Sequence, residues 1–283
     1  MTILVTGASG QLGRLVIDRL LARGADPVTL VAGARTPSKV ADLAERGIRV
    51  AALDYEDPAT IAGALDGVDR VLLISGSEVG RRFIQHRAVI DAAVSAGVSL
   101  FAYTSLAKAD ASSLPLAAEH VATEQAIAAS GLPAVILRNN WYAENYLPDL
   151  SRAAESGVLA ASAGDGRVSG AARADYAEAA AVVLLGEGHA GNVYELSGDT
   201  AWSYDDIAAA IGEVAGRPVQ YHALTTEEHA GALGAAGLDE GMTGFITALD
   251  AGIARGDLES TDTTLSRLIG RPTTPLADAL RAG

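Results

Sequence analysis

The chain has 283 residues, of which 49% are hydrophobic, and its 21 basic and 35 acidic side chains give a formal net charge of −14. This length and apolar content allow one or two domains with a large core, whereas the negative charge opposes a phosphate backbone and excludes nucleic acid as an expected partner. The absence of cysteine rules out disulfides and thiolate ligands, and we expect no metal site. Because the sequence shows neither an apolar run of roughly 18 residues nor a secretory leader, we expect a cytoplasmic protein with no membrane partner.

The N-terminal residues predict a strand, a glycine turn and a helix. Thr2–Val5 form an apolar run, glycines follow at positions 7, 10 and 13, and apolar residues then recur at helical spacing over 15–21. Such a turn brings unpaired N–H groups and the helix dipole close to a pyrophosphate. The pattern GxxGxxG differs by one residue from the common dinucleotide fingerprint, but its position between the first strand and the first helix favours a dinucleotide site over an ordinary glycine-rich turn. The expected contacts are Gly7, Ser9, Gly10, Gln11, Leu12 and Gly13.

Further apolar runs separated by helical segments predict a parallel sheet. Asp57-Pro58 has the form of a helix N-cap followed by a proline at the first helical position, and glycines 24, 47, 97 and 131 stand where helices should end. Strands without polar alternation are typical of a sheet covered on both faces. We therefore expect an α/β fold with a doubly wound parallel sheet of the Rossmann type. The expected strands are Val28–Ala32, Arg49–Leu53, Arg70–Ser75, Leu100–Thr104 and Ala134–Leu137.

Beyond residue 140 the alternation becomes irregular. Gly164-Asp165-Gly166 predicts a turn, residues 176–185 predict a buried helix, Ser203 begins another helix, and residues 225–228 resemble a capping box. We expect residues 1–150 to form the dinucleotide-binding domain. Residues 151–283 should form mainly a smaller C-terminal α/β lobe, interleaved with the sheet because some of its segments return to the first domain.

The end of the second strand indicates which dinucleotide is bound. An NAD site usually has an acidic residue there to accept hydrogen bonds from the adenosine ribose, whereas this chain has Arg35, with Lys39 four residues later. A guanidinium group can pair bidentately with a 2′-phosphate. The sequence therefore favours NADP(H) as the cofactor, although the two residues could instead be solvated surface charges.

Polar residues also end the third and fourth strands, at the sheet edge where such folds bind ligands. Asp54 and Tyr55 are placed to meet the adenine with a carboxylate and a ring face, but Asp54 could instead cap the following helix. Ser75 and Ser77 are candidate cofactor contacts that could equally be turn or cap residues.

Many motifs along the chain together resemble the type 2 NAD(P)H:quinone oxidoreductases, which belong to the NmrA-like atypical short-chain dehydrogenases. The resemblance runs from Met1 nearly to the C-terminus. Besides the glycine turn, its motifs are Ala34–Lys39, Leu72–Ser75, Tyr103–Leu106, Glu119-His120, Leu137–Asn139, Trp141-Tyr142, Glu144–Tyr146, Arg173–Tyr176 and Leu268–Thr274.

The resemblance implies an enzyme that reduces a small-molecule quinone with NADPH and needs no flavin. It also implies that Tyr103 and Thr104 belong to the cofactor site, and we expect a homodimer. Asn140 departs from the glycine that we expect in the family, so the resemblance specifies the cofactor site more closely than the shape of the acceptor pocket.

The Tyr-x-x-x-Lys pair of short-chain dehydrogenases is absent, because neither lysine follows a tyrosine by four residues. His120 and Glu124 stand in its place, on the helix after the fifth strand, and their spacing puts them on one helix face. They could form a polar pair in which His120 donates a proton or orients an acceptor, or only an ion pair on the helix surface.

Loss of the tyrosine acid does not exclude an enzyme, because a quinone takes up hydride as an aromatising and weakly basic oxyanion. The protein then has mainly to hold the nicotinamide against the quinone and supply hydrogen bonds. Phe83, Trp141 and Tyr142 could form aromatic walls. Asn139, Asn140, Tyr142 or His120 could donate hydrogen bonds, and each of these residues could instead pack in the core or cap an element.

Two other functions compete with quinone reduction. NmrA-like proteins with degraded catalytic residues bind NADP and regulate partners, so a non-catalytic dinucleotide sensor is the main alternative. A sugar-nucleotide epimerase or dehydratase is disfavoured by the missing Tyr-x-x-x-Lys pair.

Overall fold

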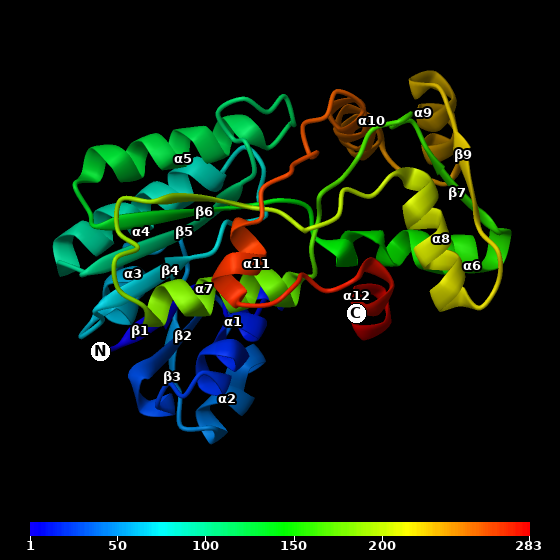
Figure 1. Cartoon of the computed structure of the whole chain (residues 1–283). Coiled ribbons are helices and arrows are strands. Elements are labelled where there is room, and N and C mark those ends of the chain that lie inside the picture. Colours follow the sequence, from blue (N-terminus) through cyan, green and yellow to red (C-terminus); the bar gives the residue numbers. More distant parts are fainter. The chain divides into compact units, whose positions relative to one another are not determined.

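The computed structural model describes residues 1–283, which divide into two compact units by their contacts (Figure 1). Unit 1 comprises Met1–Ala109, Ala118–Asn139 and Arg173–Glu195. Unit 2 comprises Asp110–Ala117, Asn140–Ala172 and Leu196–Gly283.

The main sheet has seven strands in the order β3-β2-β1-β4-β5-β6-β8. Every pair from β3 to β6 is parallel, which confirms the expected doubly wound α/β sheet and places the reversal of strand order between β1 and β4, where such folds bind ligands. The strands are β1 (Ile3–Val5), β2 (Leu30–Ala34), β3 (Arg49–Ala52), β4 (Arg70–Leu73), β5 (Leu100–Leu106), β6 (Ala134–Asn139) and β8 (Val193–Leu196).

The strand ends differ from the sequence prediction by one or two residues, as in β4, which ends at Leu73 rather than at Ser75. Val28 and Thr29 belong to a 3-10 turn capped by Asp26 rather than to β2, and the Val28 side chain is exposed. The edge strand β8 was not predicted, because only Leu196 of its four residues is buried and Glu195 interrupts the apolar run.

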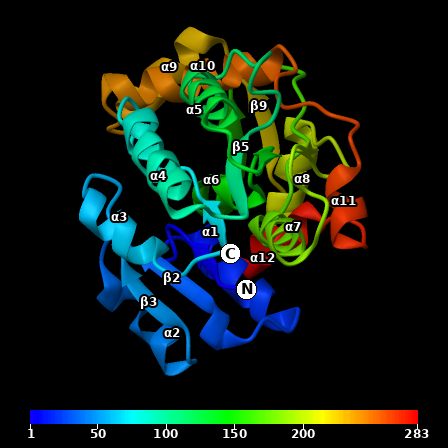
Figure 2. The same cartoon turned by 90° about the vertical axis from the view of Figure 1, so that its left-hand side faces the viewer.

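Helices cover both faces of the sheet (Figures 1 and 2). On one face α3 (Pro58–Leu65), α4 (Arg82–Ala96) and α5 (Ala117–Ser130) pack on apolar side chains of β1, β4 and β5. On the other face α1 (Gln11–Ala22) packs against α7 (Arg173–Leu185), while α2 (Ala41–Glu45) contacts β3. The predicted helix ends are confirmed. Asp57 caps α3 by accepting from the Ala59 N–H at 3.0 Å, and all four glycines expected at helix ends have positive φ.

Unit 2 contains a parallel pair of short strands, β7 (Val158–Ala161) and β9 (Gln220–Ala223). Ser203 and Thr225 each form a capping box, the latter with Glu228 as predicted. The predicted turn occurs at residues 164 and 165. The helices are α6 (Leu147–Ser156), α8 (Tyr204–Ala215), α9 (Thr226–Ala235), α10 (Glu240–Ala254), α11 (Thr264–Ile269) and α12 (Leu276–Ala282).

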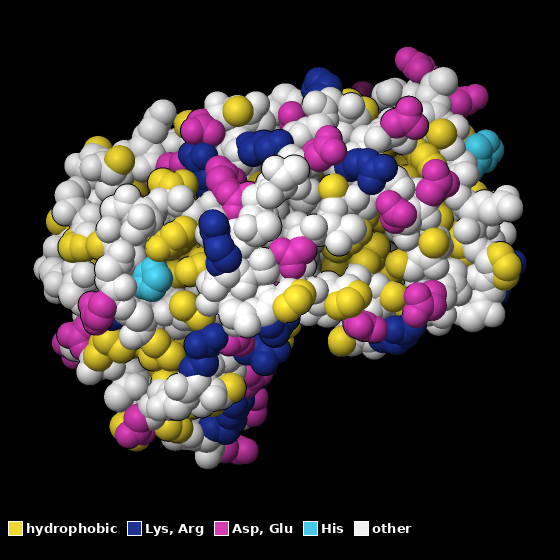
Figure 3. Space-filling model, viewed as in Figure 1, with side chains coloured by type: hydrophobic (Ala, Val, Ile, Leu, Met, Phe, Trp, Pro, Cys, Tyr) yellow, Lys and Arg dark blue, Asp and Glu magenta, His cyan; other side chains and the backbone are white.

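The surface carries acidic and basic side chains side by side. Figure 3 shows Asp and Glu side chains spread among Lys and Arg over the face that it presents, so the net charge of −14 is not gathered in one patch there. No helix combines the length and the hydropathy needed to cross a bilayer.

Candidate cofactor site

The glycine turn lies where the sequence places it, between β1 and α1. Gly7 has a φ of +59°, and a Cβ at Gly13 would lie 2.4 Å from the Gly7 carbonyl oxygen, so Gly13 allows the helix to approach the turn. At Gly10 such a Cβ would lie 3.2 Å from the Gly7 carbonyl oxygen. Apart from this tight contact, no other atom would lie within 4 Å of a Cβ at Gly10, as expected for a glycine that admits a pyrophosphate.

The start of α1 suits an anion. The helix has no side-chain cap and no acidic residue in its first turn, so its leading N–H groups are not satisfied by the chain's own side chains. Ser9, Gly10 and Gln11 are exposed, whereas Leu12 is 7% exposed and packs inward. The turn thus fits the diphosphate of a dinucleotide.

Arg35 and Lys39 follow β2 and are both exposed. Arg14 of α1 fixes this segment, because its guanidinium donates to the Lys39 carbonyl at 2.5 Å and to Asp42 Oδ2 at 2.7 Å. Arg35 is not simply solvated: its Nη1 lies 3.0 Å from Glu78 Oε1. The structure thus places a cation just beyond the end of β2, with a carboxylate beside it, and its contact with a 2′-phosphate stays a prediction.

Glu78 belongs to the β4–α4 loop, residues 75–81, which several side chains hold in place. The Ser75 N–H donates to Thr104 Oγ1 at 2.9 Å, and the Gly76 N–H donates to His86 Nε2 at 2.9 Å. The buried Arg82 donates to the Gly76 carbonyl at 2.6 Å. Ser77 is exposed on this loop. Of the two serines predicted to contact the cofactor, Ser77 is therefore open to solvent, whereas Ser75 helps to anchor the loop through its backbone.

Asp54 and Tyr55 both have internal roles. Asp54 Oδ1 accepts from the Glu56 N–H at 3.1 Å in a turn, while Asp57 caps the helix, so the alternative that Asp54 is the cap is wrong. The Tyr55 hydroxyl lies 2.5 Å from Thr6 Oγ1 and 3.0 Å from the Ile74 carbonyl oxygen, and burial raises its pKa. Tyr55 thereby joins the ends of β1, β3 and β4, and its contact with adenine stays a prediction.

Tyr103 and the histidines beside it form a buried aromatic row. The Tyr103 hydroxyl lies 2.8 Å from His120 Nδ1, and the rings of Tyr103 and His86 meet edge to face. Burial, with the charge of Arg82 nearby, lowers the pKa of His120 to about 3. Burial first, and then the charges of His120 and Arg82, lower the pKa of His86 to about 3 as well. His120 is therefore neutral at neutral pH and could act as a hydrogen-bond donor but not as an imidazolium acid.

The expected pairing of His120 with Glu124 is wrong. Glu124 instead receives hydrogen bonds from Arg138 at 3.0 and 2.7 Å and from Ser105 Oγ at 2.5 Å. Arg138 also binds Glu195, whose other oxygen accepts from the Lys108 N–H. Arg138 comes from the neighbouring strand and satisfies Glu124 more completely than a single histidine on the same helix could. This network fixes the carboxyl ends of β5 and β6.

The residues expected around the quinone have different environments. Phe83 is half-buried and packs on the core of unit 1, and Asn139 ends β6 with 5% exposure. In unit 2 Asn140 donates to Ser197 Oγ and to the Leu258 carbonyl and accepts from the Trp141 N–H, which leaves no amide hydrogen for a ligand and corrects its expected role as a donor. Trp141 and Tyr142 are half-buried, and their roles at the acceptor stay predictions.

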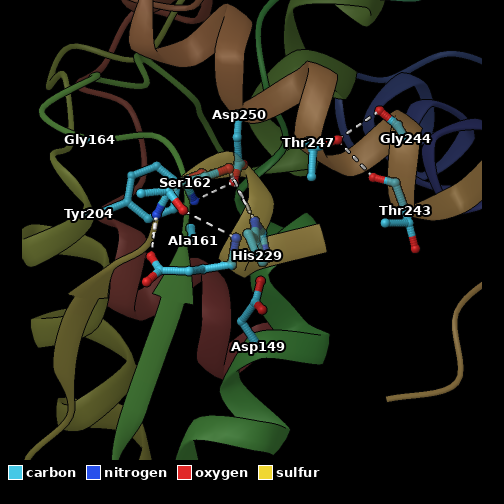
Figure 4. Close-up of polar contacts among 12 residues, drawn as sticks. Asp149, Ala161, Ser162, Gly164, Tyr204, His229, Thr243, Gly244, Thr247 and Asp250 are labelled. Carbon is cyan, nitrogen blue, oxygen red and sulfur yellow. Dashed lines mark hydrogen bonds and ion pairs between the residues drawn. The ribbon is translucent and has the colours of Figure 1, made fainter. Parts of the chain in front are cut away.

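Unit 2 contains a second polar cluster, formed by Ser162, His229 and Asp250 (Figure 4). His229 Nδ1 lies 2.9 Å from Asp250 Oδ2 and 3.3 Å from Ser162 Oγ. A nucleophilic triad needs the acid and the serine on opposite ring nitrogens, whereas here both meet the same one. The cluster therefore joins β7, α9 and α10 and has no hydrolytic geometry.

Sequence reasoning missed the polar residues that hold the β4–α4 loop. Arg82, Gln85 and His86 are buried, and they continue, at helical spacing, the same face of α4 that further along carries Val89 and Ile90. That spacing is a readable signal. Two adjacent arginines, Arg81 and Arg82, suggested an exposed helix start, but only Arg81 is exposed and Arg82 is buried.

The comparisons with known proteins cover nearly the whole chain. Residues 1–249 match the NmrA-like family. Quinone oxidoreductase 2 of Escherichia coli is 47% identical over 278 residues, which is 98% of this chain and 97% of that protein. An NAD(P)H azoreductase of Xenophilus azovorans is 30% identical, with 99% and 97% covered.

Solved structures agree with these relatives. An NADPH-dependent quinone oxidoreductase of Escherichia coli, solved in complex with NADPH, has a TM-score of 0.94 and 47% identity, with 99% of each chain covered. The triphenylmethane reductase of a Citrobacter species, complexed with NADP(H), also has a TM-score of 0.94, at 36% identity and with 100% of this chain and 99% of that one covered. With a matching sequence family and a matching fold along its length, this chain belongs to the NmrA-like family.

Proposed function

We propose that this protein is an oxidoreductase that uses NADPH to reduce a quinone, without flavin or metal. The observation that carries the proposal is the likeness over almost the full length to an NADPH-dependent quinone oxidoreductase. The cofactor site supports it independently, because an uncapped α1 follows the glycine turn and Arg35 stands where NAD sites carry an acid.

Different residues of the chain would bind different parts of the cofactor. The first N–H groups of α1 would bind the diphosphate, and Arg35 and Lys39 would bind the 2′-phosphate. Bound NADPH supplies a hydride from C4 of its nicotinamide. The anchored β4–α4 loop and the network around Arg138 keep the neighbouring strand ends rigid, which preserves the geometry that hydride transfer needs.

The acceptor must suit a protein without a strong acid. His120 is neutral because its pKa is about 3, and burial keeps the Tyr103 hydroxyl protonated by raising its pKa. Neutral N–H and O–H groups can stabilise a weakly basic oxyanion such as that of a reduced quinone, but they are poor acids for a ketone-derived alkoxide. This chemistry favours quinones over simple ketones.

The test is NADPH oxidation by the purified protein with a panel of benzoquinones and naphthoquinones and, separately, simple ketones. We expect turnover with at least one quinone, none with the ketones and none without an acceptor. Gly10→Val is the control, since it should obstruct the diphosphate site. A protein that binds NADPH yet reduces no quinone would be a dinucleotide sensor.

Two further expectations from the sequence stay predictions. A homodimer is tested by light scattering on the purified protein, and a cytoplasmic location by fractionation of the cells that produce it.

A further inference from the structure

Arg35, the residue expected to select NADPH, already has an anionic partner. Its Nη1 lies 3.0 Å from Glu78 Oε1, and the exposed fractions of the two side chains are 69% and 39%. Arg35 follows β2, whereas Glu78 belongs to the β4–α4 loop. A carboxylate therefore occupies one arm of the guanidinium that a 2′-phosphate would need for bidentate binding.

Glu78 is held in this position from its other side. Gln85 Nε2 donates to Glu78 Oε2 at 3.1 Å, and Gln85 itself is only 6% exposed on α4. The loop on either side of Glu78 is tied down, by His86 and Arg82 at Gly76 and by Glu119 at the Gly80 N–H. Glu78 is thus held by its own loop and by Gln85 at the position where it meets Arg35.

A carboxylate beside Arg35 has opposite consequences for the two dinucleotides. The 2′-phosphate of NADPH carries between one and two negative charges near neutral pH, so it must compete with Glu78 for Arg35 and is repelled by it. The 2′-hydroxyl of NADH is uncharged and can donate a hydrogen bond to a carboxylate. Glu78 should therefore weaken NADPH binding and leave NADH binding unchanged or stronger.

We propose that Glu78 is a specificity-determining residue that limits the preference of this site for NADPH over NADH. This inference rests on the proposed use of NADPH. The pair is exposed, and exposed ion pairs contribute at most about 1 kcal/mol, or roughly fivefold in an equilibrium constant. Replacing the carboxylate with an amide should then tighten NADPH binding by about threefold to fivefold.

The experiment compares wild type and Glu78→Gln by calorimetric titration with NADPH and with NADH. The amide keeps the size of the side chain and removes its charge. We expect Glu78→Gln to lower the Kd for NADPH by about threefold to fivefold and to leave the Kd for NADH equal or higher. The gain should shrink in 0.5 M salt, because added ions screen exposed charges. The Kd for adenosine 2′,5′-bisphosphate should change as that for NADPH does, and the Kd for AMP should change as that for NADH does. This comparison assigns the effect to the 2′-phosphate.

Glu56→Gln is the matched control. Glu56 also accepts from Gln85 Nε2, at 3.0 Å, but its ion-pair partner is Arg81. Glu56→Gln should leave the ratio of the Kd for NADPH to the Kd for NADH within twofold of the wild-type ratio. A Glu78→Gln protein with an unchanged or lower preference for NADPH overturns the inference while leaving the proposed function intact. A wild type that binds neither dinucleotide overturns the proposed function itself.

Discussion

Lowering the pH from 7 to 5 should destabilise the protein through the buried pair His86 and His120. Each has a pKa of about 3 in the folded protein, against about 6.5 in an unfolded chain. Because folding depresses the pKa, the unfolded chain takes up these protons first. The stability that the neutral histidines allow is therefore present above pH 6.5 and is lost as the pH falls from 6.5 toward 3.

The geometry explains why His86 stays neutral. Its Nε2 accepts from the Gly76 N–H, and its Nδ1 faces Thr123 Oγ1, which donates its own hydrogen to the Glu119 carbonyl. Nδ1 therefore carries the proton and donates to Thr123. Protonating Nε2 would set two N–H groups against each other and break the anchor of the β4–α4 loop.

The expected loss follows from the pKa difference. Each histidine contributes about 1.4 kcal/mol per pH unit once the pH is well below 6.5, which gives about 2 kcal/mol per histidine between pH 7 and pH 5. The free energy of unfolding should fall by about 4 kcal/mol from the pair over that range. Carboxylates with lowered pKa, such as Asp199, add their loss only at still lower pH.

Urea unfolding at half-unit steps from pH 7 to pH 5 measures this slope. His86→Asn and His120→Asn serve as controls, because each removes one titrating group whatever it does to the stability at pH 7. Each variant should lose about 2 kcal/mol less than wild type over the range. A wild-type free energy that stays flat between pH 7 and pH 5 refutes the reasoning.

Further substitutions test other parts of the account. Gly13→Val should cost about 3 kcal/mol or more of stability, since even its Cβ would lie 2.4 Å from the Gly7 oxygen. Gly10→Val should cost about 1 kcal/mol or less of stability and abolish NADPH binding. Urea unfolding measures the loss of stability, and titration with NADPH measures the loss of binding. Arg35→Ala should weaken NADPH binding by about tenfold to a hundredfold and spare NADH, and equal NADPH affinity would show that Arg35 is only a surface charge. Arg138→Met should cost about 3 to 5 kcal/mol because it leaves Glu124 buried without its cation; thermal unfolding at the wild-type temperature would contradict this.

The sheet and the glycine turn could be predicted because local patterns determine them. Apolar strand runs, the Asp57-Pro58 cap and the glycines at helix ends act within a few residues, and the structure confirms them. The edge strand β8 was missed because its own sequence has no apolar run: only Leu196 is buried, and Glu195 precedes it.

The side-chain partners at the candidate site could not be predicted, because they come from distant elements. Helical spacing placed His120 and Glu124 on one face, but Arg138 from β6 and Tyr103 from β5 were the better partners. Likewise, nothing in the sequence indicates that Glu78 meets Arg35, 43 residues away. Spacing along a helix predicts proximity, and competition among all nearby groups decides pairing.

Direct hydride transfer from bound NADPH to a quinone is the central claim, and a single-turnover measurement tests it. The purified protein, with no added flavin or metal, is loaded with NADPH carrying hydrogen or deuterium at the transferred C4 position and mixed rapidly with a quinone, while the absorbance of NADPH is followed. The account predicts rapid oxidation of the bound NADPH with a primary isotope effect on that step. Bound NADPH that persists in the presence of every quinone contradicts it.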